Sequence, residues 1–512
     1  KSDILGWCAY AWACEPFIVS CIGTYVPLLL EQIARDNGVK LLDHSITCNS
    51  KLEQPPDPKW KKCVLPMFNG TIYVDTSSFA LYTFAISVFI QTIVVISITG
   101  ASDKGHYKKQ LLVGGAVIGG LLTMMFILID EQMYYTSSLL SIVTNAFFGV
   151  VNVCGNSYLP ILANGHPSLK SNNDDNGLLR GQISSKISGD GASAGYISAL
   201  LVQLATMFVI LKFKRKSSSS SNSSEESIWP IQVAICFVGF WWLIFQIPVL
   251  ILLRSKRANE ELVVKPITSQ TINKHFQGNY LLLKLLSQST YIIYGWSTLS
   301  KTIRQASGLK DIVIFLTSWF IISDSLTTIN STAILFAKTE LSMSTLQLAV
   351  VGTLTMLSAI VGAYVIPNYI QPFLKLSLKK LLQIIIIWSS LIPLYGILGF
   401  FFQSFGLKHN FEIFILAVWY GVSLGGIAAV SRSLFSMLIP KGKESMYFAL
   451  FQITDKGSSI IGPLVVALIT DKTHNIRHCF WFLWIVLIIS LPILEMLDLQ
   501  RGKDEADFLQ RI

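Results

Sequence analysis

Residues 10–23 read YAWACEPFIVSCIG, in which the acid Glu15 is followed directly by Pro16. They belong to an apolar segment, residues 4–33, that exceeds the roughly 20 residues a helix needs to cross a bilayer. A charged side chain at bilayer depth costs roughly 2.5–3.5 kcal/mol, and a proline removes a hydrogen bond from its helix. Lipid tolerates such a break only where protein or a water-filled cavity satisfies the polar groups. We therefore expect Glu15 and Pro16 to face a polar cavity inside a membrane protein.

Apolar segments of this length recur along the whole chain. Of its 512 residues, 52% are hydrophobic and 14% are charged, whereas soluble globular proteins carry about 25% charged residues. We predict an all-α membrane protein with twelve transmembrane helices. The predicted spans are residues 4–33, 79–100, 111–130, 136–162, 187–211, 228–253, 311–336, 344–370, 381–405, 410–438, 446–470 and 477–497. The net charge of +10 fits the basic cytosolic loops of membrane proteins, so we expect the lipid bilayer and no nucleic acid as a partner.

The chain divides into two sets of six spans around its longest charged segment. We predict an N-terminal six-helix bundle (1–253), a cytosolic linker with an amphipathic helix (254–310), a C-terminal six-helix bundle (311–500) and a cytosolic tail (501–512). The start of span five, SGDGASAGYISALLVQ, weakly repeats span eleven, TDKGSSIIGPLVVALIT. Weakly repeated halves are typical of transporters built from two parallel six-helix repeats.

The loops favour an orientation with both termini in the cytosol. In this orientation Lys and Arg are more frequent in the cytosolic segments. The glycosylation sequons at Asn69 and Asn222, and the pair Cys48 and Cys63, which could form a disulfide, then lie in the lumen. The basic cluster at 212–216 argues against this orientation, because the cluster would then also lie in the lumen. With no CxxC pair and no His cluster, we expect no metal site and no cofactor.

Polar side chains on several other spans indicate the same cavity. Both charge signs occur among them, which suits a small zwitterionic solute. The candidate residues beside Glu15 and Pro16 are Asn145 and Asn152 on span four, Asp324, Thr328 and Asn330 on span seven, and Gln452, Asp455 and Lys456 on span eleven.

Structural interpretations of these residues remain open. Asp455 and Lys456 could neutralise each other, and the asparagines could join helices through hydrogen bonds. For Arg432, near the end of span ten, we favour snorkelling to lipid phosphate. We favour a functional role for Glu15 and Asp324, which lie near mid-membrane.

The loop between spans two and three reads GASDKGHYKKQ. It resembles the Asp-(Arg/Lys)-x-Gly-(Arg/Lys)-(Arg/Lys) loop of the major facilitator superfamily, which latches helix ends in one transport state. The resemblance implies that Asp103 is the latch acid and that Lys104, Lys108 and Lys109 are its cations. The spacing departs from the motif, and the alternative is an ordinary basic turn.

Long blocks along the chain resemble the fungal autophagy-related protein 22 family. They are GWCAYAWACEPFIVS, TYVPLLLEQIARDNGV, VDTSSFALYTF, WFIISDSLTTINSTAILFAK, WYGVSLGGIAAVSRSLFSMLIPKGKES and ITDKGSSIIGPLVVALITDKTHNIR. The resemblance implies a vacuolar amino-acid effluxer of the major facilitator superfamily. Such a protein exports leucine, isoleucine, tyrosine and similar amino acids to the cytosol after autophagic breakdown.

We therefore expect a multi-pass vacuole-membrane transporter that works by alternating access and is not an enzyme. Its partners would be free amino acids and, by hypothesis, protons that Glu15 or Asp324 takes from the acidic lumen. Two alternatives remain: a membrane receptor or structural protein without transport, and a major facilitator transporter of another small solute.

Overall fold

The computed structural model of the protein places most of the chain. The residues it describes are 2–41, 43–48, 63–68, 70–103, 107–171, 178–218, 228–253, 293, 295–297, 299–300, 309–341, 343, 345–440, 442–459, 461–473 and 475–511. Within these residues, twelve helices are long and apolar enough to cross a membrane. Each overlaps one predicted span, in the same order, so the prediction of twelve transmembrane helices is confirmed.

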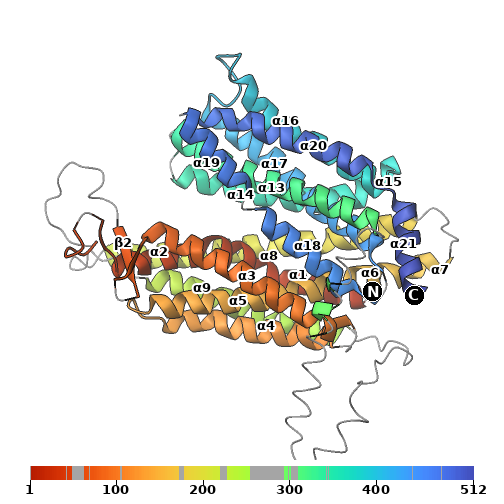
Figure 1. Ribbon diagram of the computed structural model, residues 1–512, viewed down its shortest axis with the longest axis horizontal. Coiled ribbons are helices and arrows are strands. Elements are labelled where there is room, and N and C mark those ends of the chain that lie inside the picture. The colour runs from red at the N-terminus through yellow and green to blue at the C-terminus, as the bar shows by residue number, and fades with distance from the viewer. Residues whose placement is uncertain are drawn as a thin grey trace, which may run out of the picture.

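The first six spans form one bundle and the last six form another (Figure 1). The spans of the N-terminal bundle consist of α1 (Ser2–Pro16), η1 (Phe17–Tyr25) and α2 (Val26–Asp36); α3 (Thr76–Asp103); α4 (Lys108–Met124) and η3 (Met125–Leu128); α5 (Tyr134–Asn156) and α6 (Tyr158–Asn164); α8 (Leu178–Ser218); α9 (Trp229–Ile244) and α10 (Gln246–Leu252). Those of the C-terminal bundle consist of α13 (Lys310–Thr339); α14 (Thr345–Val365), η6 (Ile366–Ile370) and α15 (Gln371–Leu374); α16 (Leu378–Leu398); α17 (Asn410–Leu438); α18 (Glu444–Ser458) and α19 (Ile461–Thr473); η7 (Ile476–His478) and α20 (Cys479–Glu495).

Each bundle has its own apolar core. Trp7, Phe17 and Trp242 are fully buried in the first core, and Phe315 and Phe435 in the second. Within the C-terminal bundle, α14 and α17 approach closely because α17 carries glycines on the facing side. A Cβ on Gly425 would collide with the carbonyl oxygen of Ala359.

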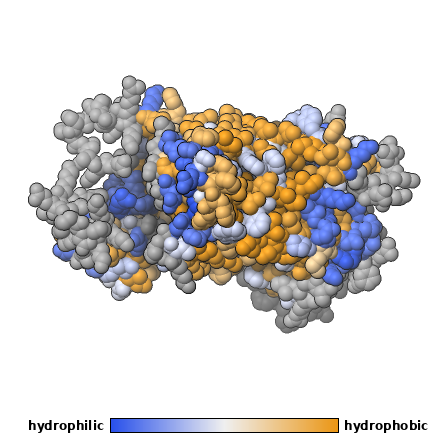
Figure 2. Space-filling view, turned by 90° about the horizontal axis from the view of Figure 1, so that it is seen from above, coloured by the Kyte–Doolittle hydropathy of each residue, from blue (hydrophilic) through white to orange (hydrophobic). Residues whose placement is uncertain are grey.

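On the face shown in Figure 2, the middle of the molecule is largely apolar, and hydrophilic residues gather toward both of its ends. Large apolar side chains, among them Phe89, Phe208 and Leu464, are exposed in the spans. In water such exposure would be unfavourable, whereas in a bilayer these side chains contact lipid.

A small antiparallel sheet lies at one end of the long axis, and both termini lie at the other (Figure 1). We call these the sheet end and the terminus end. The sheet consists of β1 (Val39–Lys40), β2 (Cys63–Met67) and β3 (Ile72–Asp75), in this spatial order. Lys40 pairs with Cys63 in the register of β1 and β2, and a disulfide joins Cys48 to Cys63.

The segment predicted as a tail forms a helix, α21 (Leu499–Arg511), held to the C-terminal bundle. Arg501 donates two hydrogen bonds to the Asp311 carboxylate, at 2.6 and 2.7 Å. Most of the predicted linker lies outside the described residues. Near its end, Trp296 Nε1 donates to Ser97 Oγ of α3 at 3.0 Å.

Candidate functional site

The helix of the first span changes its winding at Pro16. α1 ends at this residue, and the chain continues as the π-helix η1. Proline has no N–H to donate, so a regular α-helical pattern cannot continue through it. Beside the break, Gly195 of α8 leaves room for the Glu15 side chain, since a Cβ on Gly195 would lie 3.1 Å from the Glu15 Cβ.

The half-buried Glu15 side chain faces charges of the opposite bundle. The charges of Arg432 on α17 and Lys456 on α18 act on its carboxylate. Tyr196 of α8 lies in the combined field of Glu15, Arg432 and Asp455. Among the described residues, neither Glu15 nor Arg432 has a hydrogen-bond or ion-pair partner. We call Glu15, Tyr196, Arg432, Asp455 and Lys456 the central charge cluster.

Asp455 and Lys456, the two residues of the central charge cluster on α18, interact with each other and with α13. Lys456 Nζ lies 3.8 Å from Asp455 Oδ2, and both side chains are about 30% exposed. Ser323 Oγ donates to Asp455 Oδ1 at 2.7 Å. A pair this long and this exposed is weak, so Lys456 stays available to a second anion.

Gln452, one turn before Asp455, points toward the N-terminal bundle. Its side chain is buried, and neither atom of its amide group has a hydrogen-bond partner among the described residues. A cavity of about 10 Å³ separates it from Gln91 and Thr92 of α3. This is room for about one water molecule. The polar face of α18 predicted from the sequence therefore lies where the bundles meet.

Asp324 occupies a different place, inside the C-terminal bundle. The eleventh span is interrupted where α18 ends at Ser458 and α19 begins at Ile461. Asp324 Oδ1 accepts a hydrogen bond of 2.8 Å from the N–H of Gly462. The first N–H groups of a helix have no partner within it. The geometry thus gives Asp324 the role of a cap for α19, and Thr328 is buried beside it, donating to the Asp324 carbonyl at 2.7 Å.

The asparagines of the fourth span also have different surroundings. Asn145 is buried and donates to Ser87 Oγ of α3 at 2.9 Å, so it joins two helices of one bundle. Asn152 is half-buried, and its Oδ1 accepts hydrogen bonds from Tyr10 Oη of α1 at 3.2 Å and Asn156 Nδ2 at 2.7 Å.

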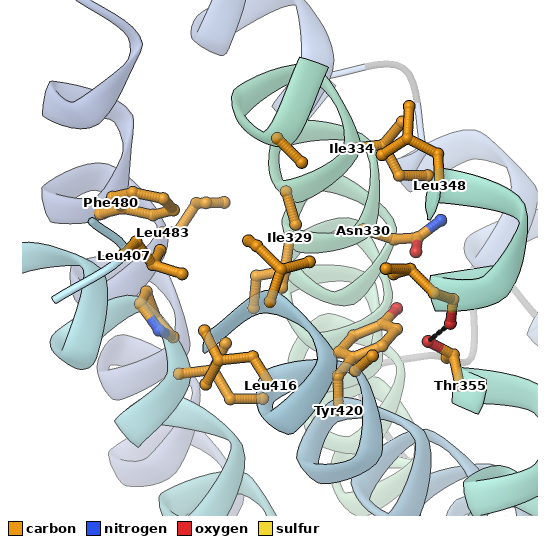
Figure 3. Close-up of a pocket in the computed structure, with 17 residues that line it drawn as sticks. Ile329, Asn330, Ile334, Leu348, Thr355, Leu407, Leu416, Tyr420, Phe480 and Leu483 are labelled. Carbon is orange, nitrogen blue, oxygen red and sulfur yellow. Dashed lines mark hydrogen bonds between the residues drawn. The ribbon is translucent and has the colours of Figure 1, made fainter. Parts of the chain in front are cut away.

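Asn330 is exposed on α13, at the edge of a cavity of about 50 Å³ in the C-terminal bundle (Figure 3). α13, α14, α16, α17 and α20 contribute to its lining, which is mostly apolar. Two other polar residues at the cavity, Thr355 and Tyr420, donate to backbone carbonyls at 2.9 Å. The Asn330 amide has no partner in the described part of the chain.

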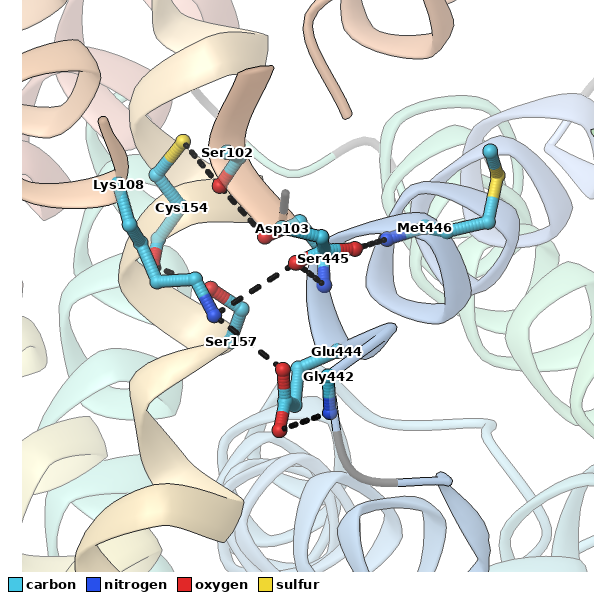
Figure 4. Close-up of polar contacts among 9 residues, drawn as sticks. All are labelled: Ser102, Asp103, Lys108, Cys154, Ser157, Gly442, Glu444, Ser445 and Met446. Carbon is cyan, nitrogen blue, oxygen red and sulfur yellow. Dashed lines mark hydrogen bonds and ion pairs between the residues drawn. The ribbon is translucent and has the colours of Figure 1, made fainter. Parts of the chain in front are cut away.

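At the terminus end, polar contacts join the two bundles (Figure 4). Both Asp103 oxygens accept hydrogen bonds of 3.0 Å, from the N–H groups of Ser445 and Met446 at the start of α18. Lys108 Nζ lies 3.6 Å from Asp103 Oδ1 and 3.4 Å from Glu444 Oε2. Lys109 instead donates to the Leu250 carbonyl of its own bundle at 2.8 Å. Lys104 lies outside the described residues.

A second group of contacts closes the same end between α8 and α17. Ser184 Oγ lies 2.9 Å from Ser436 Oγ and accepts from Ser433 Oγ at 3.2 Å. Nearby, Asn368 of η6 donates to Asp190 of α8 at 2.9 Å. All the serines of this group are buried. The terminus end is therefore closed by side chains from both bundles.

Toward the sheet end the bundles separate (Figure 1). α2 packs on α3 and α5 of its own bundle, and α19 packs on α13. Along α13 the residues Thr327, Asn330 and Ser331 are exposed. An exposed polar stripe would be costly in contact with lipid, so this face of α13 is a candidate for contact with water.

Sequence reasoning missed several residues of this site. Arg432, for which snorkelling to lipid phosphate was favoured, is half-buried, and its charge acts on Glu15, Tyr10 and Tyr196 of the other bundle. Tyr196 and Glu444 were not predicted. Tyr196 follows Gly195 in the repeated glycine segment, which was the signal available for it.

The predicted lumenal features fall partly within the structure. The Cys48–Cys63 disulfide links the loop after α2 to β2, with a Cα–Cα distance of 5.8 Å. The sequon residues Asn69 and Asn222 lie outside the described residues.

Comparison with known proteins assigns this arrangement to a family. The model of the family "Vacuole effluxer Atg22 like" matches residues 1–507. The chain belongs to this family. Autophagy-related protein 22 of Pichia angusta is 52% identical to it, with 99% of this chain and 94% of the relative covered. The Saccharomyces cerevisiae S288c protein of the same name is 46% identical, with 100% and 94% covered. The family resemblance seen in the sequence is thus confirmed.

Solved structures similar to this family member are major facilitator transporters. The proton:xylose symporter XylE has a TM-score of 0.60 at 14% identity, covering 99% of this chain and 98% of its own. FucP in the outward conformation has a TM-score of 0.60 at 13% identity, with 97% and 98% covered. At such identity the likeness shows the fold alone, and it confirms the predicted major facilitator architecture.

Proposed function

We propose that this chain is an alternating-access transporter that exports free amino acids from the vacuole lumen to the cytosol. The observation that carries the proposal is Glu15 in one bundle facing Arg432 and Lys456 in the other. A zwitterion matches this arrangement, with its ammonium on Glu15 and its carboxylate on the two cations. The description of the family as vacuole effluxers supports the direction. The resemblance to autophagy-related protein 22 supports leucine, isoleucine and tyrosine as cargo during autophagic recycling.

With both termini in the cytosol, the closed terminus end is the cytosolic side. We infer that the exposed polar face of α13 lines a water-filled vestibule where the bundles separate at the sheet end (Figure 1). This vestibule would admit solute from the lumen, where the disulfide and the sequons are expected. Release to the cytosol requires the bundles to rock apart at the Asp103 and Ser184 contacts, as in transporters built from two six-helix repeats.

Proton coupling belongs to the same proposal, with Glu15 as the carrier. Glu15 is half-buried and has no hydrogen-bond partner among the described residues, whereas Asp324 is fixed by its bond to Gly462. For a proton from the acidic lumen to drive export, it must cross to the cytosol together with the amino acid. Protonated Glu15 can still accept a hydrogen bond from the substrate ammonium through its carbonyl oxygen, so both can occupy the site at once.

Transport by purified protein in liposomes tests the proposal. The measurement is net transport of radiolabelled leucine, with and without a pH gradient. We expect Glu15→Gln to lower the rate at least about tenfold, since it removes a charge-assisted contact. Glu31→Gln is the matched control, because Glu31 is a half-buried residue of α2 whose one ion pair among the described residues is with Arg35 of the same helix.

The outcomes separate the alternatives. No flux of any solute would favour a membrane receptor or structural protein. Flux of sugars without amino acids would favour a transporter of another solute. Equal leucine rates with and without the gradient would exclude proton coupling while leaving amino-acid transport intact.

A further inference from the structure

The cavity beside Asn330 opens next to the polar stripe of α13, away from the central charge cluster. Ala417 lines this cavity and Arg432 belongs to the cluster, and both lie on α17. At 1.5 Å per residue they are about 22 Å apart along the helix. A single amino acid cannot reach across this distance, so the cavity is a separate position nearer the sheet end.

The size and the apolar lining of this cavity fit a small aliphatic side chain. A volume of about 50 Å³ corresponds to roughly three to five water-sized spheres. The branched side chains of leucine and isoleucine have four carbon atoms. The lining is aliphatic and aromatic, with Ile329, Leu416 and Phe480 among its residues (Figure 3). The polar groups at this cavity are the Asn330 amide and the hydroxyls of Thr355 and Tyr420, which already donate to backbone carbonyls, so a charged group would be poorly compensated there.

We propose that this cavity is an entry subsite that binds the aliphatic side chain of a neutral amino acid before the solute reaches the central charge cluster. The inference rests on the proposed function. The side chain fills the cavity, and the amino and carboxyl groups stay in the vestibule. There the free Asn330 amide, which both donates and accepts hydrogen bonds, contacts them. The subsite favours leucine and isoleucine over alanine and glycine before either reaches Glu15.

Filling the cavity tests this assignment. Ala333 is a half-buried lining residue on α13, so Ala333→Leu occupies the space with little change at the surface. We expect KM for leucine to rise about tenfold, the effect of a few methylene groups in a partly open apolar pocket. KM for alanine and kcat for both substrates should stay unchanged. Val313→Leu, at an exposed residue of α13 outside the cavity lining, is the control and should behave like the parent protein.

A second variant keeps the test informative if Ala333→Leu does not fold. Leu348→Ala enlarges the cavity from α14 and should shift preference from leucine toward phenylalanine. The inference is overturned if leucine and alanine respond equally to Ala333→Leu, or if neither responds because the space holds a lipid acyl chain or only a packing void. A parent protein that moves no amino acid would instead overturn the proposed function.

Discussion

The Asp103 carboxylate, at the last residue of α3, accepts a hydrogen bond of 3.0 Å from the backbone N–H of Ser445, in the first turn of α18 in the other bundle. A carboxylate at a helix N-terminus gains both a charge-assisted hydrogen bond and a favourable interaction with the helix dipole. The contacts of the proposed latch therefore cross between the bundles through backbone groups, and they include Lys108 but not Lys109.

Asp103→Asn should loosen the closed terminus end. Replacing a charged acceptor by a neutral one costs about 1–1.5 kcal/mol, which is a five- to tenfold shift toward the open state. The measurement is alkylation of a cysteine placed at the buried Ser436, in a background without other reactive cysteines. A membrane-impermeant maleimide applied at the terminus side should react five to ten times faster. Lys109→Gln is the control and should leave the rate unchanged; equal rates for both variants would contradict the latch.

Lys108 neutralises two acids at once, which predicts strong coupling with Glu444. The three side chains of this group, including Asp103, are at most 12% exposed. Lys108→Gln leaves two carboxylates without their cation and should destabilise the closed state by about 3 kcal/mol. Glu444→Gln on top of it should restore more than about 1 kcal/mol. The same alkylation assay on both single variants and the double variant gives the coupling energy, and strictly additive effects would refute it.

The transmembrane helices could be predicted from the sequence because a bilayer requires long apolar segments, and that requirement is local in the chain. Pro16 likewise marked a real change of helix winding. The direction of each polar side chain could not be predicted in the same way, because helix rotation is set by packing against distant segments. Asp324 and Glu15 look alike in the sequence, yet one caps α19 and the other faces the opposite bundle. Arg432 near a helix end suggested lipid phosphate, and only the packing of α17 against the other bundle brings its charge near Glu15 and Tyr196.

Two substitutions at Arg432 separate a role in solute binding from a lipid contact. Arg432→Leu should lower leucine exchange in liposomes at least about tenfold, because a bound carboxylate loses a charge-assisted partner. Arg432→Lys should keep part of the activity, since it retains the charge but not the bidentate geometry. Arg35→Leu, at an exposed arginine of α2, is the control and should export normally. Full activity in Arg432→Leu would show that Arg432 does not bind solute and would favour its contact with lipid phosphate.

Substitution of Asp324 should lower the stability of the protein, whereas substitution of Glu15 should lower transport. Asp324→Ala removes the acceptor for Gly462 N–H and should lower the free energy of unfolding by about 1–2 kcal/mol, as for other lost helix caps. Asp324→Asn keeps an acceptor oxygen and should lose less. A thermal melt of purified protein in detergent measures both, and leucine KM in liposomes should remain near that of the parent protein for whichever variant folds. If Asp324→Asn instead abolishes exchange while its melting temperature is unchanged, Asp324 takes part in transport, and the difference from Glu15 inferred from the structure is wrong.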